Sequence, residues 1–338
     1  MLDIKINWRI IIHHMDDILV HIGPYARATW FGAGKTFAFT LFFYYISIAS
    51  LGFGVHDAWW SICAWIIFRA LVVLRIFIIV HDCSHYALFP SMCANSWIGI
   101  LLGGVVLTPI KQWRRGHNYH HQNSGNLLVV CLEHAIKSGD TIFLTRAEWD
   151  NMKGWKRTFL RYFRSPLHFF TIVPLLLFFV AYRIPGRVTK VNTYLTTFLK
   201  LLEVSVIMYV WHNINFLWME FIALWMTAIA GMMLFHLQHG VNKGYRVINA
   251  EYNAALSSIH GATFLTFIPW YLKWATLGIE YHHIHHLNTR VPCYRLANCH
   301  ESAPDGTWKD VNHVSFREAI FAMSNVMWNE KTQLYESF

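Results

Sequence analysis

Charged residues are scarce in this sequence of 338 residues. Only 14% of its positions are Asp, Glu, Lys or Arg, whereas 55% are hydrophobic. Soluble domains usually carry about 25% charged residues, so the composition argues against an ordinary soluble domain and for an integral membrane protein. Residues 1–17 mix charges with short apolar stretches and lack the continuous apolar core of a signal peptide. We therefore expect the first hydrophobic span to direct membrane insertion.

Cysteine pairs are also missing. The six cysteines form no CxxC pair and no zinc-ribbon spacing, which argues against a disulfide framework and a thiolate metal site. The formal net charge is +9, but the basic residues flank apolar runs instead of forming a stripe among exposed aromatics, so no nucleic-acid partner is expected. The positive-inside rule places the region where they concentrate on the cytoplasmic side. These residues are Lys111, Arg114, Arg115, Lys153, Lys156, Arg157, Arg161 and Arg164.

Long apolar runs predict the membrane topology, because an α-helix needs about 20 residues to cross a hydrocarbon core of about 30 Å. Four spans are expected, near residues 36–55, 58–80, 167–182 and 217–235. The apolar residues 97–110 are too few to cross, and Pro109 lies at their end, so they predict a re-entrant or interfacial helix. Residues 204–211 are short and end at polar residues, so we expect them to be interfacial too.

The remaining regions, 81–165 and 236–338, are expected on the cytoplasmic side, the second as a cap without a span. The sequence thus predicts one all-α integral membrane domain over residues 1–338, with about four transmembrane helices, interfacial helices and a cytoplasmic helical cap. Arg69 and Arg75 fall inside the second span, where each would cost about 2.5–3.5 kcal/mol near the bilayer centre. Both are expected to face protein or to extend toward the membrane surface.

Histidines carry the chemical signal, because about half of the 21 gather in four short groups beside apolar segments. The groups are HDCSH with His81 and His85, HNYHH with His117, His120 and His121, FHLQH with His236 and His239, and YHHIHH with His282, His283, His285 and His286. On a helix, residues at i, i+3 and i+4 share one face, so each HxxxH or HxxHH aims its imidazoles in one direction.

Eight box histidines aimed into one space are too many ligands for a single ion, so two metal ions are implied. Neutral imidazole suits Zn, Cu, Fe and Ni, and a structural zinc site usually takes only four ligands. A nitrogen-rich pair of ions beside a bilayer is best explained by redox work on a lipid-soluble substrate, with iron as the metal for O2 activation. One HxxxH alone would match by chance, but three boxes in order on one membrane face would not.

The three boxes resemble those of the membrane fatty acid desaturase family, and most closely its acyl-lipid ω-6 (Δ12-type) branch. The flanking sequence shares the resemblance, with Arg75 six residues before the first box and YHHIHHLNTRVPCYRL around the third. The resemblance implies that His81, His85, His117, His120, His121, His282, His285 and His286 are di-iron ligands. A further ligand is expected from FHLQH, where His239 is favoured over His236, and His283 falls on a variable position of the third box.

The resemblance also implies the reaction and its partners. We expect an O2-dependent oxidoreductase that introduces a cis double bond into a fatty acyl chain carried by a lipid, by CoA or by a carrier protein. No HPGG haem motif is present, so electrons would come from an external donor such as ferredoxin or cytochrome b5. The expected location is the bacterial inner membrane or the endoplasmic reticulum, with the active site on the cytoplasmic side. Asp82 could hold a ligand imidazole or could simply face solvent.

Three rival interpretations remain open from the sequence. Hydroxylases, conjugases, epoxygenases and carotenoid-modifying oxygenases share similar histidine boxes and would keep the metal site while changing the product. An intramembrane metalloprotease would explain HDCSH as an HxxxH pair with an adjacent acid, but would leave the other boxes unexplained. A bis-histidine haem electron carrier or a metal transporter would need facing histidines within spans, whereas these lie at the ends of spans and beyond.

Overall fold

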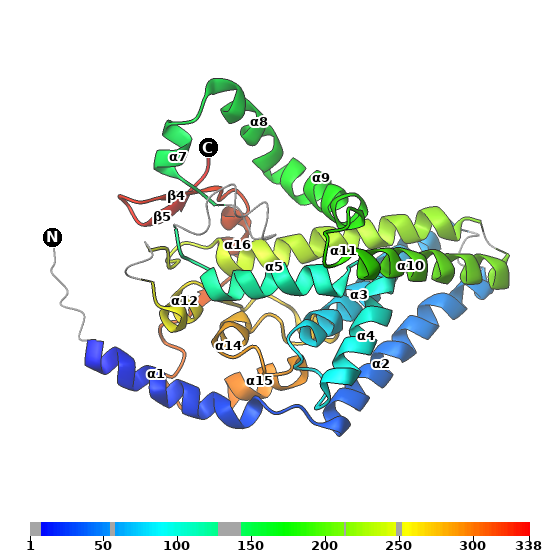
Figure 1. Ribbon diagram of the computed structural model, residues 1–338, viewed down its shortest axis with the longest axis horizontal. Helices are drawn as coiled ribbons and strands as arrows, with labels where there is room; N and C mark the ends of the chain where they lie inside the picture. Colours follow the sequence, from blue (N-terminus) through cyan, green and yellow to red (C-terminus); the bar gives the residue numbers. More distant parts are fainter. Residues whose placement is uncertain (1–7, 55–57, 128–142, 213, 248–251) are drawn as a thin grey trace.

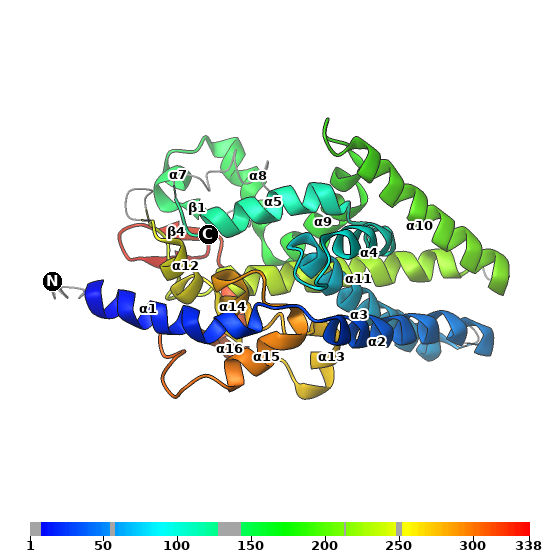
Figure 2. The same ribbon diagram turned by 60° about the horizontal axis from the view of Figure 1, so that its bottom comes forward.

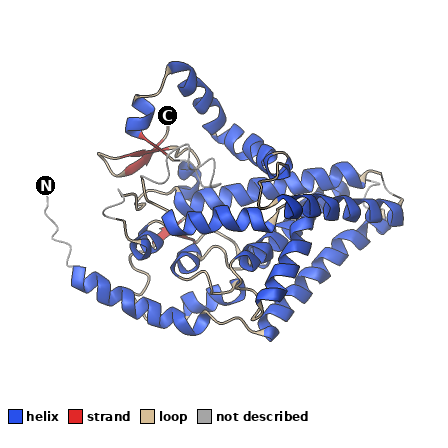
Figure 3. Ribbon diagram, viewed as in Figure 1, coloured by secondary structure: helices blue, strands red, loops and turns tan. Residues whose placement is uncertain are grey.

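The computed structural model describes residues 8–54, 58–127, 143–212, 214–247 and 252–338, except for the side chains of residues 8–14. Helices dominate these ranges, and the few short strands lie at the end of the molecule where the two termini also lie (Figure 3). The predicted all-α membrane fold is therefore confirmed, with two minor sheets added.

Five helical segments are long and apolar enough to cross a membrane. They are α2 (Trp30–Ala49) continued by the 3-10 turn η2 (Ser50–Phe53), α3 (Trp59–Ser84), α9 (Pro166–Phe179) continued by η3 (Ala181–Arg183), α10 (Lys190–Trp211) and α11 (Phe216–His239). Helix α3 is the most buried of them and packs against both α2 and α11. The long helices α2, α10 and α11 extend to one end of the molecule in Figure 1, and the short helices and strands lie toward the other.

Helix α10 differs from the expectation of a short interfacial piece at residues 204–211. These residues form the last part of a 22-residue helix, whose Trp211 side chain lies against Gly52 at the end of α2. Lys200 and Glu203 interrupt the apolar run, but both are paired with other charged groups inside the helical bundle. The charged residues thus interrupt the apolar run in the sequence, but the helix continues through them.

Helices α9 and α10 follow one another from the histidine end toward the opposite end, and α11 returns (Figure 1). The ring of Phe170 near the start of α9 lies 5.3 Å from that of His236 near the end of α11, whereas Phe179 lies 5.0 Å from Phe221 near its start. Helices α9 and α10 together thus run the length that α11 covers alone, and the two count as one crossing. The four crossings expected from the sequence remain a prediction that is compatible with five helices.

A bent helical pair lies between the first two histidine boxes. Helices α4 (Met92–Val105) and α5 (Ile110–Asn123) meet at 105°. The bend requires glycine, because a Cβ at Gly99 would lie 2.2 Å from Ile110 Cδ1 and one at Gly103 would lie 2.7 Å from the Thr108 carbonyl oxygen. Since α4 follows the first box and α5 carries the second, both ends of the pair belong to the same side, which favours the re-entrant arrangement over a crossing.

A buried charge network joins the long helices. Arg69, which has no exposed surface, donates from Nε to Glu220 at 2.8 Å and from Nη2 to Glu203 at 2.9 Å. Lys200 lies 3.0 Å from Glu203 and also contacts Glu220, so two positive and two negative groups balance. Tyr44 of α2 donates its hydroxyl to Glu203. The expectation that Arg69 faces protein is confirmed, and its cost in the membrane is offset by two carboxylates.

The cap is built from short elements around the ends of α3, α5 and α11 (Figure 2). Its helices are α1 (Trp8–Ile22), α7 (Arg146–Asp150), α8 (Gly154–Arg164), α12 (Ala254–His260), α13 (Lys273–Thr276), α14 (His282–Leu287), α15 (Cys293–Glu301) and α16 (Phe316–Ala322), with 3-10 turns η1 (Gly23–Tyr25) and η5 (Trp270–Leu272). One sheet pairs β2 (Thr263–Leu265) with β3 (Asn312–Val314), and another orders β1 (Leu144–Thr145), β4 (Met327–Asn329) and β5 (Leu334–Glu336). Beyond His239, no helix among the described residues passes as a span.

Candidate metal centre

The first box ends the long helix α3. His81 lies in its last turn and His85 follows as its C-terminal cap, so the two imidazoles share one face with their ring centres 5.0 Å apart. Both are buried. The next residue, Tyr86, has a φ of 57°, in the left-handed region, which ends the helix directly after the second imidazole. The chain thus leaves α3 at the histidines and returns along α4.

The second and third boxes each distribute their histidines in two directions. On α5, His117 and His121 are one turn apart with their Nε2 atoms at 3.1 Å, whereas His120 turns to the other side. On α14, His282 and His286 are four residues apart and lie together, whereas His285 turns away toward His121, with an Nε2–Nε2 distance of 3.0 Å. The expectation that each of these boxes aims its imidazoles in one direction is therefore wrong. Helical geometry allows the division, because the last two histidines of each box are consecutive and point about 100° apart.

Helix α11 brings the ninth imidazole. His239, its last residue, places Nε2 at 3.0 Å from His120 Nε2 and at 3.0 Å from His282 Nε2. Its backbone carbonyl accepts a hydrogen bond of 2.8 Å from the hydroxyl of Tyr335 in β5. The carbonyl of the following residue, Gly240, accepts another of 2.7 Å from Asn325. The C-terminal segment therefore fixes the end of α11, a role that no motif in the sequence indicates.

The nine histidines form two adjacent groups, within each of which one nitrogen per ring lies within 4.8 Å of all the others. All nine ligands that the sequence predicted are brought together in these groups. The first group is His81, His85, His117, His121 and His285, and the second is His120, His239, His282 and His286. Either group could hold a metal ion.

The spacing of the nitrogens fits metal ligation. Two nitrogens that each lie about 2.1 Å from one ion, at right angles, are about 3 Å apart, which matches the distances above. A neutral imidazole has one donor and one acceptor nitrogen, so hydrogen bonds alone cannot satisfy a closed set of rings whose Nε2 atoms converge. Nε2 of His85 and Nε2 of His286 are both buried and find no hydrogen-bond partner among the residues that the structure describes. Ions bound within the groups would give these nitrogens a partner.

Electrostatics keep the site in the ligating form. Burial, and then the mutual repulsion of neighbouring imidazoles, lower the pKa of His282, His285 and His286 well below the usual range. Such histidines are neutral at physiological pH, and the neutral form is the one that binds metals. The site is therefore preorganised for cations even without acidic ligands.

Two histidines of the four sequence groups lie outside both clusters. His236 donates a hydrogen bond of 2.8 Å from Nε2 to the carbonyl of Ala322. Its ring also packs against the rings of Phe143, Phe169 and Phe170. His283 is fully buried and faces His300, with a nitrogen–nitrogen distance of 3.2 Å. Of His236, His239 and His283, only His239 lies in a cluster, and its role as a metal ligand stays a prediction.

Asp82 does not face solvent, because it is 1% exposed. One carboxylate oxygen lies 3.3 Å from Nδ1 of His81, and the other accepts a hydrogen bond of 2.6 Å from the backbone N–H of Cys293, the first residue of α15. The carboxylate thus orients a predicted ligand and ties the first box to the segment that follows the third. A carboxylate behind a metal-bound imidazole fixes the orientation of the ring.

Replacing Asp82 with asparagine should weaken metal binding about 10- to 100-fold, because the charged acceptor on His81 is lost while the side-chain shape is kept. Metal content of the purified protein after dialysis against graded chelator concentrations measures the effect. Asp150→Asn is the matched control, because Asp150 is exposed and distant from the boxes. Unchanged metal retention in Asp82→Asn would contradict this role.

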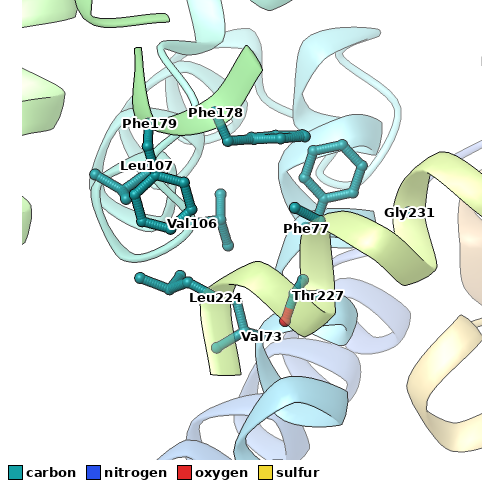
Figure 4. Close-up of a pocket in the computed structure, with 10 residues that line it drawn as sticks. Val73, Phe77, Val106, Leu107, Phe178, Phe179, Leu224, Thr227 and Gly231 are labelled. Atoms are coloured by element: carbon teal, nitrogen blue, oxygen red, sulfur yellow. The ribbon is translucent and has the colours of Figure 1, made fainter. Parts of the chain in front are cut away.

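An aromatic layer separates the first histidine group from a pocket inside the helical bundle. Trp113 stacks on His117 with ring centres 4.7 Å apart, and Phe77 packs against Trp113 at 5.3 Å. Phe77 also lines a narrow apolar pocket between α3, α9, α11 and the bend that joins α4 to α5 (Figure 4). Among the described residues that line it, Thr227 alone carries a side-chain oxygen, and that hydroxyl donates to the carbonyls of Ala70 and Ala223.

Comparison with known proteins agrees with this geometry. The fatty acid desaturase family model matches residues 57–314. A fatty acid desaturase of Bacillus subtilis is 29% identical over 270 residues, covering 78% of this chain and 74% of the relative. An endoplasmic reticulum omega-3 fatty acid desaturase of Nicotiana tabacum is 26% identical over 254 residues, covering 74% and 55%. An oleoyl-12-hydroxylase of Ricinus communis is 29% identical over 90 residues, covering 26% and 23%.

The match to the family model spans more than half of the chain and contains all three histidine boxes. The geometry argues against a simple metalloprotease, because His81 and His85 belong to a group of five imidazoles and do not form an isolated pair. The chain belongs to the fatty acid desaturase family.

Proposed function

We propose that the nine clustered histidines hold two iron ions and that the protein uses O2 to introduce a cis double bond into a fatty acyl chain. The convergence of nitrogen ligands from α3, α5, α11 and α14 into two adjacent groups carries the proposal. A ligand set made only of imidazoles, with an apolar pocket beneath it, suits redox chemistry on a hydrocarbon.

Iron in such a site would supply the oxidant that removes hydrogen from two adjacent methylene groups. For each double bond the balance is one O2, two electrons from a donor and two protons consumed, and two water molecules released. The protein's own part is to hold the imidazoles neutral, to keep bulk water away and to place the chosen carbons beside the metals. Correct positioning alone is worth about 7–11 kcal/mol of a reaction barrier.

The apolar pocket supports an acyl substrate. Its lining is almost wholly aliphatic and aromatic, and the described side chains that form it offer no free polar group, as expected where a hydrocarbon chain binds. Phe77 and Trp113 connect it to His117, so a chain bound there would extend away from the first histidine group. The depth of the pocket would then decide which carbons lie beside the metals.

Gly231 offers a test of this assignment, because it lines the pocket and a Cβ there would meet nothing within 4 Å. Gly231→Phe should fill the space and shift activity toward shorter chains, or lower it about tenfold or more on long ones, whereas Gly231→Ala should leave chain-length preference unchanged. Product analysis with acyl chains of graded length measures the effect. The same preference in Gly231→Phe as in the wild type would place the acyl chain elsewhere.

A fatty acyl hydroxylase is the second candidate, because one matching relative is an oleoyl-12-hydroxylase and the same site serves both outcomes. Mass spectrometry of the fatty acids from a host that expresses the protein separates the two. A new unsaturated acid supports desaturation, and a new hydroxy acid supports hydroxylation. Iron analysis of the purified protein tests the metal, and zinc as the only bound metal would contradict the redox assignment.

The partners proposed here are an acyl lipid, acyl-CoA or acyl carrier substrate, O2 and an external electron donor such as ferredoxin or cytochrome b5. The protein is a multi-pass membrane protein, and its histidine groups are proposed to lie on the cytoplasmic side. The basic region between the second and third long helices supports that orientation by the positive-inside rule. The bacterial inner membrane and the endoplasmic reticulum both satisfy it.

A further inference from the structure

Two buried arginines lie beside the metal centre without an acidic partner. Arg164, the last residue of α8, is 6% exposed, and none of its three guanidinium nitrogens has a hydrogen-bond partner among the described residues. Arg246 is 5% exposed, and its Nε donates to the hydroxyl of Tyr335 at 2.8 Å. Neither forms an ion pair with an acidic residue in the part of the chain that the structure describes.

Both guanidinium groups converge on one aromatic ring. The central carbon of Arg164 lies 5.7 Å from the ring centre of Phe143, and that of Arg246 lies 4.9 Å from it. Arg164 also lies over Phe169 at 4.0 Å. Contacts with aromatic faces stabilise a cation by less than the burial of an unpaired charge costs. We call Arg164, Arg246 and Phe143 the two-arginine site.

The electrostatic strain is visible in Arg164 itself. Burial lowers the pKa of its guanidinium to about 9, which still leaves the group charged at physiological pH. Two buried positive groups around one ring repel one another unless an anion lies between them. Arg69 is also buried, but two carboxylates neutralise its charge. The two-arginine site contains no carboxylate among the described residues.

The position of the site indicates which anion would reach it. Arg164 lies two residues before Pro166, where α9 begins its apolar run, and so it lies where the basic segment of α8 gives way to a helix apolar enough to enter a membrane. The rings of Phe143 and Phe169 lie 5.5 Å and 5.8 Å from that of His236, one helical turn before His239. The site is therefore one aromatic layer away from the last turn of α11, at the level where lipid head groups lie.

We propose that the two-arginine site binds the phosphate of a phospholipid head group, whose acyl chain is the one presented to the histidine groups. This inference rests on the proposed desaturase function. Phosphate suits the site, because its several oxygens can accept from two separate guanidinium groups, and basic pockets at the cytoplasmic boundary bind anionic head groups. Arg164 and Arg246 then position the substrate and take no part in the bond chemistry.

Substitution of Arg164 with methionine separates binding from folding. Removing an unpaired buried charge should leave the thermal midpoint of the lipid-free, detergent-solubilised protein equal or higher. Phosphatidylglycerol should raise the midpoint of the wild type and not that of Arg164→Met, and monogalactosyldiacylglycerol with the same acyl chains should raise neither. Arg161→Met, which removes an exposed arginine one turn earlier on α8, should respond to phosphatidylglycerol like the wild type.

Kinetics add a second measurement. With a phospholipid substrate, Arg164→Met should raise KM about tenfold or more and change kcat less, because charge-assisted hydrogen bonds to the head group are lost. Desaturation of the galactolipid should be the same in both proteins. A wild type that shows the phosphatidylglycerol shift but makes no double bond would support the site and contradict the proposed function.

Three results would overturn the proposal. Equal phosphatidylglycerol shifts in the wild type and Arg164→Met would show that the guanidinium does not bind the head group. A lower lipid-free midpoint in Arg164→Met would show that the arginine stabilises the fold by itself. A larger shift of the wild type with acyl-CoA or acyl carrier protein than with phosphatidylglycerol would assign the phosphate to a different carrier.

Discussion

Replacement of His282 with alanine is expected to lower product formation more than about 100-fold. Loss of a residue that only hydrogen-bonds a metal ligand already costs about 10- to 100-fold, and loss of a ligand itself should cost more. The variant removes one of the four imidazoles of the second group and leaves His120, His239 and His286. The first group keeps its five ligands, so iron content should fall from two ions per chain toward one. Fatty-acid analysis of an expressing host and iron determination on the purified protein measure both effects.

His283→Ala is the matched control, because it removes the same side chain from the adjacent position of the same helix. His283 is as buried as His282, so the loss of packing is comparable, but it faces His300 and Trp308 rather than either histidine group. This variant should keep two ions per chain and most of its product. If both variants lose iron equally, the loss reflects damage to α14, and the assignment of His282 as a ligand is wrong.

Replacement of Glu220 with glutamine is expected to destabilise the protein by about 3–5 kcal/mol, because the buried Arg69 and Lys200 then share a single carboxylate, that of the partly buried Glu203. The shape of the side chain is retained, so the effect reports charge. Unfolding of the purified protein in detergent, followed by near-ultraviolet circular dichroism, measures it. A single variant as stable as the wild type would contradict the role of the network.

The double variant Arg69→Met with Glu220→Leu should recover much of the lost stability. It removes one positive and one negative group and leaves Lys200 and Glu203 as a pair 3.0 Å apart. Asp150→Asn is the exposed control, because its partner Arg146 is 46% exposed and such surface pairs contribute at most about 1 kcal/mol. Failure of the double variant to recover would mean that hydrogen bonds, rather than charge balance, stabilise the bundle.

The sequence predicts the clustering of the histidines well, because their spacing is local. The i, i+3 and i+4 pattern places His117, His120 and His121 on one side of one short helix whatever surrounds it. It does not predict how the imidazoles divide between two groups, because that depends on the rotation of α5 against α14. It also misses Tyr335 and Asn325, whose hydrogen bonds to the end of α11 join residues far apart in the chain.

The membrane helices are predicted less completely, for an electrostatic reason. Hydropathy treats Lys200 and Glu203 as breaks in an apolar run, although in the bundle they pair with Glu220 and Arg69 and do not meet lipid as bare charges. Asp82 illustrates the same limit, because an acidic residue beside a box is equally compatible with solvent and with burial. Only the fold shows that its carboxylate binds a backbone N–H of α15.

The division of the boxes has a consequence for the order in which the protein takes up metal. Helix α5 gives two imidazoles to the first group and one to the second, and α14 gives one and two. An ion captured by either group fixes both helices, so the second ion meets ligands that are already immobilised. Uptake by the metal-free protein should therefore be cooperative, with a sigmoidal titration and few molecules that carry a single ion.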